Sequence, residues 1–151
     1  MNKKNNRKGF TTVELIIVIA VIAILATVMI PTFSNLIGKA NKSAALQEAT
    51  NAVKLITLHN VDPDTDDNNV FGDIILEVDG YYFGMIGGQL VQATKANDGT
   101  YTIEAGDKYY TLKTLSSDLE LGGVAYTATK SAVDVADLDE NTVKIYTLKK
   151  S

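Results

Sequence analysis

The chain has 151 residues, enough for one domain with a modest core, and it contains no cysteine and a single histidine, His59. Disulfides, thiolate metal sites and histidine-rich metal clusters are therefore excluded. The first nine residues hold four bases (Lys3, Lys4, Arg7 and Lys8) and no acid, whereas the rest of the chain carries ten bases against eighteen acids. Because phosphate binding needs a basic surface, this acidic body disfavours nucleic acid as a partner.

The basic start is followed by an apolar run, Leu15 to Ile30, whose only polar member is Thr27. Residues 10–30 would form a helix of about 31 Å, close to the thickness of a bilayer core. The run is too long for the apolar part of a secretory signal peptide, and no Ala-x-Ala cleavage site follows it. It predicts a single-pass transmembrane helix with a cytoplasmic N-terminus, because basic flanks stay on that side.

Glu14 lies near the start of this apolar segment. An ionised group at the centre of a membrane costs roughly 2.5–3.5 kcal/mol, so such a residue is by default a candidate functional residue. A glutamate so close to the end of the segment can also reach the interface and have no further role. In hydrocarbon a carboxylate and an amine cost less together than apart, so a function for Glu14 calls for a cationic partner.

Residues 8–14, Lys-Gly-Phe-Thr-Thr-Val-Glu, resemble the N-terminal signal of type IV pilins and pseudopilins. In that family a peptidase cuts after the glycine that ends a basic leader and methylates the new N-terminal residue. The resemblance implies that residues 1–9 are a leader cleaved after Gly9 and that Phe10 is methylated. It also implies that Glu14, at the fifth mature position, pairs with the N-terminal amine of a neighbouring subunit. Pro31 falls at the twenty-second mature position, where the family commonly has proline.

The resemblance further implies a function and its partners. The protein would be a structural subunit of a type IV pilus-like filament, held first in the cell membrane and later in a pilus at the cell surface. Its partners would be other pilin subunits in a homopolymer, the prepilin peptidase, an assembly platform protein and an assembly ATPase. Two alternatives stay open: a minor pilin or pseudopilin of a type II secretion or competence system, and a membrane-anchored binding module that never polymerises. We expect no enzyme, because the sequence has no catalytic constellation.

Pro31 opens the next segment, residues 31–60, and predicts a helix kink near Thr27, because proline lacks an N–H and clashes with the preceding turn. The segment has the pattern of an amphipathic helix that must bury one face. Together with residues 10–30 it would form a helix of about 50 residues. The expected apolar stripe comprises Phe33, Ile37, Ala40, Ala44, Ala45, Ala49, Ala52, Ile56 and His59, the last as a packing residue rather than a ligand.

Acidic residues and a proline predict a loop over residues 61–69. Asp62, Asp64 and Asp66 alternate as the oxygen ligands of a calcium loop do. The match is partial, since Asp67 stands where such a loop has glycine. We therefore expect no metal and no cofactor, with calcium at these three aspartates as the alternative.

Residues 61–151 predict a head domain, because short strand-like segments are separated by turn residues. Asp79-Gly80 suits the type I′ turn of a β-hairpin. The expected strands are 74–78, 81–86, 89–95, 100–105, 108–114, 124–129 and 142–148. The fold class is α+β, with a long N-terminal helix packed on a small antiparallel sheet. This arrangement is also the pilin fold that the resemblance implies.

Overall fold

The structure is a computed structural model that describes residues 9–65, 70–106, 108–113, 115, 118–121, 124–132 and 135–150. Helix α1 (Thr12–Val61) comes first. The strands that follow are β1 (Ile74–Val78), β2 (Tyr81–Ile86), β3 (Gln89–Lys95), β4 (Tyr101–Ala105), β5 (Lys108–Leu112), β6 (Asp118–Leu121), β7 (Val124–Lys130) and β8 (Val143–Lys150). The chain divides into two compact units, Met1–Asn41 and Lys42–Ser151, so α1 contributes to both. The expected boundaries at residues 9, 30 and 60 stay predictions.

The described strands form a closed antiparallel barrel, in which each strand pairs with the next and β8 returns to pair with β1. In the first hairpin Val78 pairs with Tyr81 across the turn Asp79-Gly80. Both turn residues have positive φ, 49° at Asp79 and 77° at Gly80, as a type I′ turn requires. The hairpin expected at this position is therefore confirmed.

Side chains alternate along β1 between two separate apolar cores. Ile74, Leu76 and Val78 belong to the core that β1, β2 and β8 share with α1, whereas Ile75 belongs to the core inside the barrel. Eight strands leave an interior just wide enough for side chains to fill. The buried residues of this interior core are Ile75, Ile86, Ala93, Ile103, Tyr110, Leu112 and Ala128.

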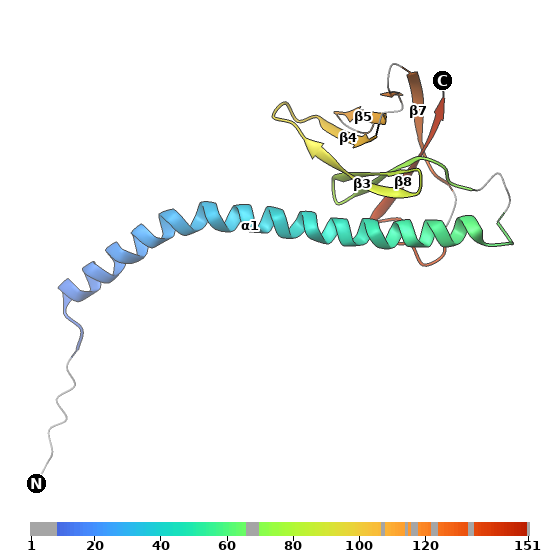
Figure 1. Cartoon of the computed structure of the whole chain (residues 1–151). Helices are drawn as coiled ribbons and strands as arrows, with labels where there is room; N and C mark the ends of the chain where they lie inside the picture. Colours follow the sequence, from blue (N-terminus) through green and yellow to red (C-terminus); the bar gives the residue numbers. More distant parts are fainter. Residues whose placement is uncertain are drawn as a thin grey trace, which may run out of the picture. The chain divides into compact units, whose positions relative to one another are not determined.

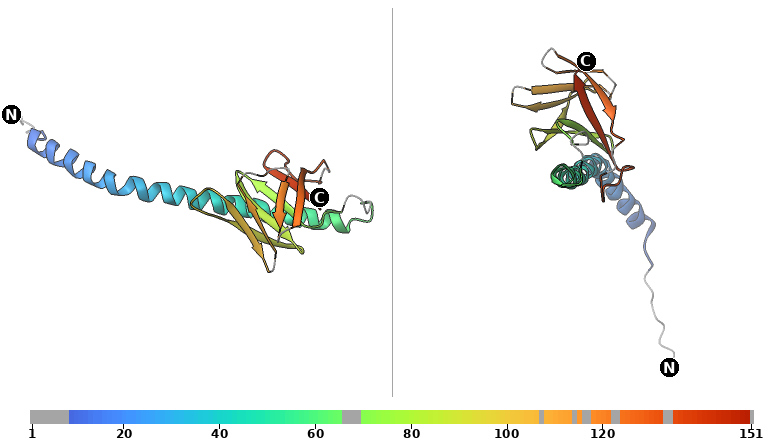
Figure 2. Two further views of the ribbon diagram at one scale, coloured as in Figure 1. Left: turned by 90° about the horizontal axis from the view of Figure 1, so that it is seen from above. Right: turned by 90° about the vertical axis from the view of Figure 1, so that its right-hand side faces the viewer.

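The part of α1 from Ala45 to Ile56 packs on the outer face of the barrel (Figure 1). Its contact side is formed by Ala45, Ala49, Ala52 and Ile56, each at most 1% exposed. Small side chains on this side let the helix backbone approach the strands closely, and Figure 2 shows this part of α1 against the sheet from two more directions. This half of the expected stripe is confirmed, and so is the α+β class.

The first half of the expected stripe is not buried: Phe33 is 65% and Ile37 is 53% exposed. His59, at the other end, packs as expected, with its ring 5.6 Å from that of Phe71. The difference arises because the core shared with the barrel begins at Ala45 on α1.

The sheet is larger and more closed than the sequence predicted. Strand β6 (Asp118–Leu121) was not expected, nor was the pairing of β1 with β8 that closes the barrel. Gly87-Gly88, between the expected strands 81–86 and 89–95, forms the turn of a second hairpin that joins β2 to β3. Both glycines have positive φ, 58° and 76°, a conformation that glycine adopts without steric cost.

Candidate assembly site

The first turn of α1 is closed by a reciprocal pair of hydrogen bonds between Thr11 and Glu14. The Glu14 backbone N–H donates to Thr11 Oγ1 at 3.2 Å, and the Thr11 backbone N–H donates to Glu14 Oε2 at 2.8 Å. The Thr11 hydroxyl also donates to Glu14 Oε2, at 2.8 Å. This is a capping box, in which two backbone N–H groups that have no partner within the helix are satisfied by side chains.

The capping box gives the Glu14 carboxylate a role within its own chain. It fixes the side chain beside the start of the helix, where the helix dipole also favours a negative charge. Both hydrogen bonds from Thr11 end on Oε2, and among the described residues no donor reaches Oε1. The geometry therefore orders the carboxylate and leaves one of its oxygens for a donor from outside the helix.

Gly9 and Phe10 lie outside α1, which begins at Thr12. The Phe10 side chain is 90% exposed, and a Cβ added at Gly9 would meet no atom within 4 Å. The bond between these two residues thus lies on an open, non-helical segment, as a peptidase substrate requires. Cleavage there and methylation of Phe10 remain predictions.

The apolar run of α1 is exposed on all sides. Its large apolar side chains between Val13 and Ile30 are 49–69% exposed. By length and composition α1 contains a stretch apolar enough to cross a membrane, and none of that stretch is buried within the chain. A helix that is apolar all round needs an apolar environment, either lipid or other helices.

Thr27, within this run, and Thr32, just after it, satisfy their hydroxyl groups locally. Thr27 Oγ1 donates to the carbonyl of Ile24 at 2.6 Å, and Thr32 Oγ1 donates to the carbonyl of Val28 at 2.7 Å. Both hydroxyl groups therefore have an acceptor within the helix. An unpaired hydroxyl in hydrocarbon would cost roughly several kcal/mol. Helix α1 is continuous through Pro31. The kink expected near Thr27 remains a prediction.

The aspartates of the acidic loop are only partly described. Asp62 and Asp64 follow the end of α1, and Asp62 Oδ1 accepts a hydrogen bond from the Asp64 backbone N–H at 3.0 Å. Asp66 lies outside the described residues. Among the described residues no three His, Cys, Asp or Glu side chains come together in a metal-binding group. Calcium binding remains a prediction.

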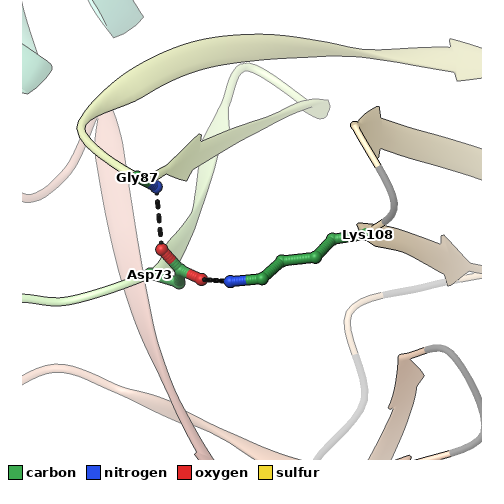
Figure 3. Close-up of polar contacts among 3 residues, drawn as sticks. All are labelled: Asp73, Gly87 and Lys108. Carbon is green, nitrogen blue, oxygen red and sulfur yellow. Dashed lines mark hydrogen bonds and ion pairs between the residues drawn. The ribbon is translucent and has the colours of Figure 1, made fainter.

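Asp73, at the far end of the same connection, is held by the barrel (Figure 3). Its Oδ1 accepts a hydrogen bond from the Gly87 backbone N–H at 2.9 Å, and its Oδ2 is 2.8 Å from Lys108 Nζ. Burial raises the pKa of Asp73, but the hydrogen bonds from Lys108 and Gly87 and the charge of Lys108 outweigh it and leave the pKa below 3.8. The Asp73 carboxylate thus joins the start of β1 to the β2–β3 turn and to β5.

Sequence reasoning missed two of these features. The partnership of Thr11 with Glu14 has a local signature, since threonine followed three residues later by glutamate is the pattern of a capping box. The Asp73–Lys108 pair spans 35 residues and has no such signature. Of the predicted site residues, the structure brings Glu14 next to Thr11 and leaves Gly9 and Phe10 open.

The family described as the prokaryotic N-terminal methylation motif matches residues 4–30. The matched residues include Gly9, Phe10, Glu14 and the apolar run of α1. The major component of the type IV wide pilus of Thermus thermophilus is 44% identical over 57 residues, which are 38% of this chain and 44% of that protein. A type IV major fimbrial protein of Dichelobacter nodosus is 44% identical over 45 residues, which are 30% of this chain and 29% of that protein.

The N-terminal segment of the chain is therefore similar to that of type IV pilus and fimbrial proteins. The matches cover less than half the length of the relatives. No solved structure matches the chain.

Proposed function

We propose that the protein is the precursor of a structural subunit of a type IV pilus-like filament. The observation that carries this proposal is the coincidence of the methylation motif at residues 4–30 with a helix that exposes apolar side chains on every side. In this proposal residues 1–9 are removed after Gly9, Phe10 is methylated, and residues 10–30 hold the subunit in the membrane until it enters the filament. An N-terminus on the cytoplasmic side and a head outside follow from the basic leader.

Polymerisation in this proposal depends on Glu14. Cleavage after Gly9 creates an amine on Phe10, and a neighbour's amine would supply the cation that Glu14 lacks. The capping box supports this role, because it orders the carboxylate before any neighbour arrives and so lowers the entropy lost on pairing. Contacts from head to tail along one helix bundle produce an open helical polymer rather than a closed oligomer.

The names of the relatives favour a major subunit over a pseudopilin, since both are described as major components of a pilus or fimbria. Assembly would involve other copies of the chain, the prepilin peptidase, a platform protein and an ATPase. The contrasting proposal, a membrane-anchored binding module, shares the anchor but makes no use of the Glu14 carboxylate.

The test is expression of the full precursor in cells that have a prepilin peptidase and a pilus assembly system. Intact-mass analysis of the mature protein should show an N-terminus at Phe10 carrying one added methyl group. Glu14→Gln should leave the processed monomer in the membrane and abolish sheared filaments, whereas Glu104→Gln, at an exposed position of β4, should leave filaments unchanged. A mature N-terminus beyond Pro31, or normal filaments from Glu14→Gln, would refute the proposal.

A further inference from the structure

A cavity of about 320 Å³ opens at the barrel end that carries the β1–β2 turn. Seven of the residues that line it carry charged or aromatic side chains: Lys42, Asp79, Tyr81, Tyr82, Phe83, Lys95 and Tyr101. They come from α1, the turn, and strands β2, β3 and β4. The volume is at the small end of the range of about 300–1,000 Å³ typical of ligand pockets.

The cavity lies where the first two residues of β2, Tyr81 and Tyr82, are not paired with β3. The pairing of β2 with β3 runs from Ile86 with Gln89 to Phe83 with Gln92 and stops there. Tyr81 and Tyr82 therefore extend past the last β2–β3 pair, whereas β3 continues to pair with β4 as far as Lys95 with Tyr101. The gap between the start of β2 and the end of β3 is thus a consequence of strand register, and its walls are held by the sheet.

Aromatic rings form one side of this gap. The rings of Tyr82 and Tyr101 meet edge to face, with centroids 5.1 Å apart and an interplanar angle of 71°. This contact joins β2 to β4 and fixes both rings, so a ligand would meet them already ordered. A tyrosine combines an apolar face with a polar hydroxyl, which suits a ligand with C–H groups on one face and hydroxyls around its edge.

The charge of the lining is positive, although the body of the chain is acidic. The lining includes two lysines and one aspartate, Asp79, and the Lys95 ammonium lies 5.6 Å from the centroid of the Tyr101 ring. Among the described residues neither Lys42 nor Lys95 has an ion-pair partner within 4.0 Å. The two ammonium groups can therefore bind an anionic group on a ligand that stacks on the tyrosines.

We propose that this cavity, the tyrosine–lysine pocket, binds a small acidic sugar such as a uronic acid. The sugar ring would stack on the tyrosines, its hydroxyls would bond to the tyrosine hydroxyls and to Asp79, and its carboxylate would lie between Lys42 and Lys95. The acidic surroundings disfavour a polyanion such as nucleic acid, but a ligand with a single carboxylate fits the excess of one positive charge. The pocket lies wholly within residues 42–151, so this proposal is independent of filament assembly.

The experiment is an NMR titration of the full chain in zwitterionic, sugar-free detergent micelles, with glucuronic acid as the probe and glucose as its uncharged counterpart. Glucuronic acid should give saturable shifts of the Tyr82 and Tyr101 ring signals and leave Tyr110, inside the barrel, unchanged. Glucose should bind about tenfold more weakly, because it lacks the carboxylate that the lysines bind.

Matched lysine variants locate the site. Lys42→Gln and Lys95→Gln should each weaken glucuronic acid binding by about tenfold, and Lys54→Gln, an exposed position on the same helix as Lys42, should not. All three positions are exposed, so the fold should be retained. The proposal is overturned by the absence of saturable shifts, by equal binding of glucose, by an equal effect of Lys54→Gln, or by tighter binding of oligothymidylate.

Discussion

The two halves of α1 are both rich in apolar residues, yet they relate to the rest of the chain in opposite ways. Between residues 13 and 30 the large apolar side chains are 49–69% exposed, whereas Ala45, Ala49, Ala52 and Ile56 are at most 1% exposed. The second half obtains its partner, the barrel, from its own chain. The first half obtains none there and must find one in lipid or in other helices. We therefore expect folding of the head not to depend on the environment of the N-terminal half of α1.

The largest effect should come from a truncation on the buried side of α1. Ile56→Ala should lower the free energy of unfolding of the head by about 2–5 kcal/mol, because it leaves a cavity at a residue that is 0% exposed. Ile22→Ala, at a residue that is 57% exposed, should leave the head within about 0.5 kcal/mol of the parent. Denaturant unfolding of the full chain in micelles, followed by tyrosine fluorescence, measures both. Equal losses would show that folding of the head depends on both halves of α1.

A methyl group added in the barrel should have the next largest effect. A Cβ at Gly84 would lie 2.8 Å from Ile103 Cγ2 and 3.1 Å from Ile86 Cγ1, so Gly84→Ala should overpack the barrel and cost about 1–3 kcal/mol. The same change at Gly38, on α1, meets no atom within 4 Å and should instead stabilise the helix by about 0.5–1 kcal/mol. Thermal unfolding followed by circular dichroism distinguishes the two. A stabilising Gly84→Ala would contradict the packing described here.

Loss of the capping box should have a smaller and local effect. Thr11→Ala removes both side-chain hydrogen bonds to the first turn of α1, so amide hydrogen exchange there should accelerate by roughly 2- to 30-fold. Thr12→Ala is the matched control, because the capping hydrogen bonds come from Thr11. Exchange in the barrel should not change with either variant. If the two variants behave alike, the capping box does not stabilise the turn.

The smallest expected effect concerns acid stability of the head. The pKa of Asp73 is lowered in the folded chain, so its contribution is fully present above its ordinary pKa of 3.8 and is lost as pH falls through the folded value. Asp73→Asn should therefore flatten the decline in head stability below about pH 4. Lys108→Gln should do so too, because it removes the main donor to Oδ2. Unfolding titrations across this pH range provide the measurement, and full additivity in the double variant would show that the pair is not coupled.

Much of the fold follows from local sequence patterns. The apolar run and the 3.6-residue period predicted α1, and Asp79-Gly80 predicted the first hairpin, because both depend on neighbours in the chain. Strand β6, with four residues, is too short to show a clear alternation. Closure of the barrel joins β1 to β8 across about 70 residues, and no local pattern encodes such a pairing.

The candidate site divides in the same way. Gly9, Phe10 and Glu14 were predicted as site residues because their types and spacing within six residues resemble a known family signal. Thr11 could have been predicted from the same few residues. The exposure of Phe33 and Ile37 was not predictable, because apolar spacing shows which side of a helix is apolar but not how much of its length the head covers.

The closed barrel has a consequence for aggregation between copies of the head. Open sheets present unpaired backbone groups at their margins, and these groups can recruit strands from other molecules. Each described strand of this head pairs along at least part of its length with a strand on either side, so no described strand is an edge strand. Closure of the sheet therefore lowers the tendency of neighbouring copies of the head to join edge to edge in a cross-β aggregate.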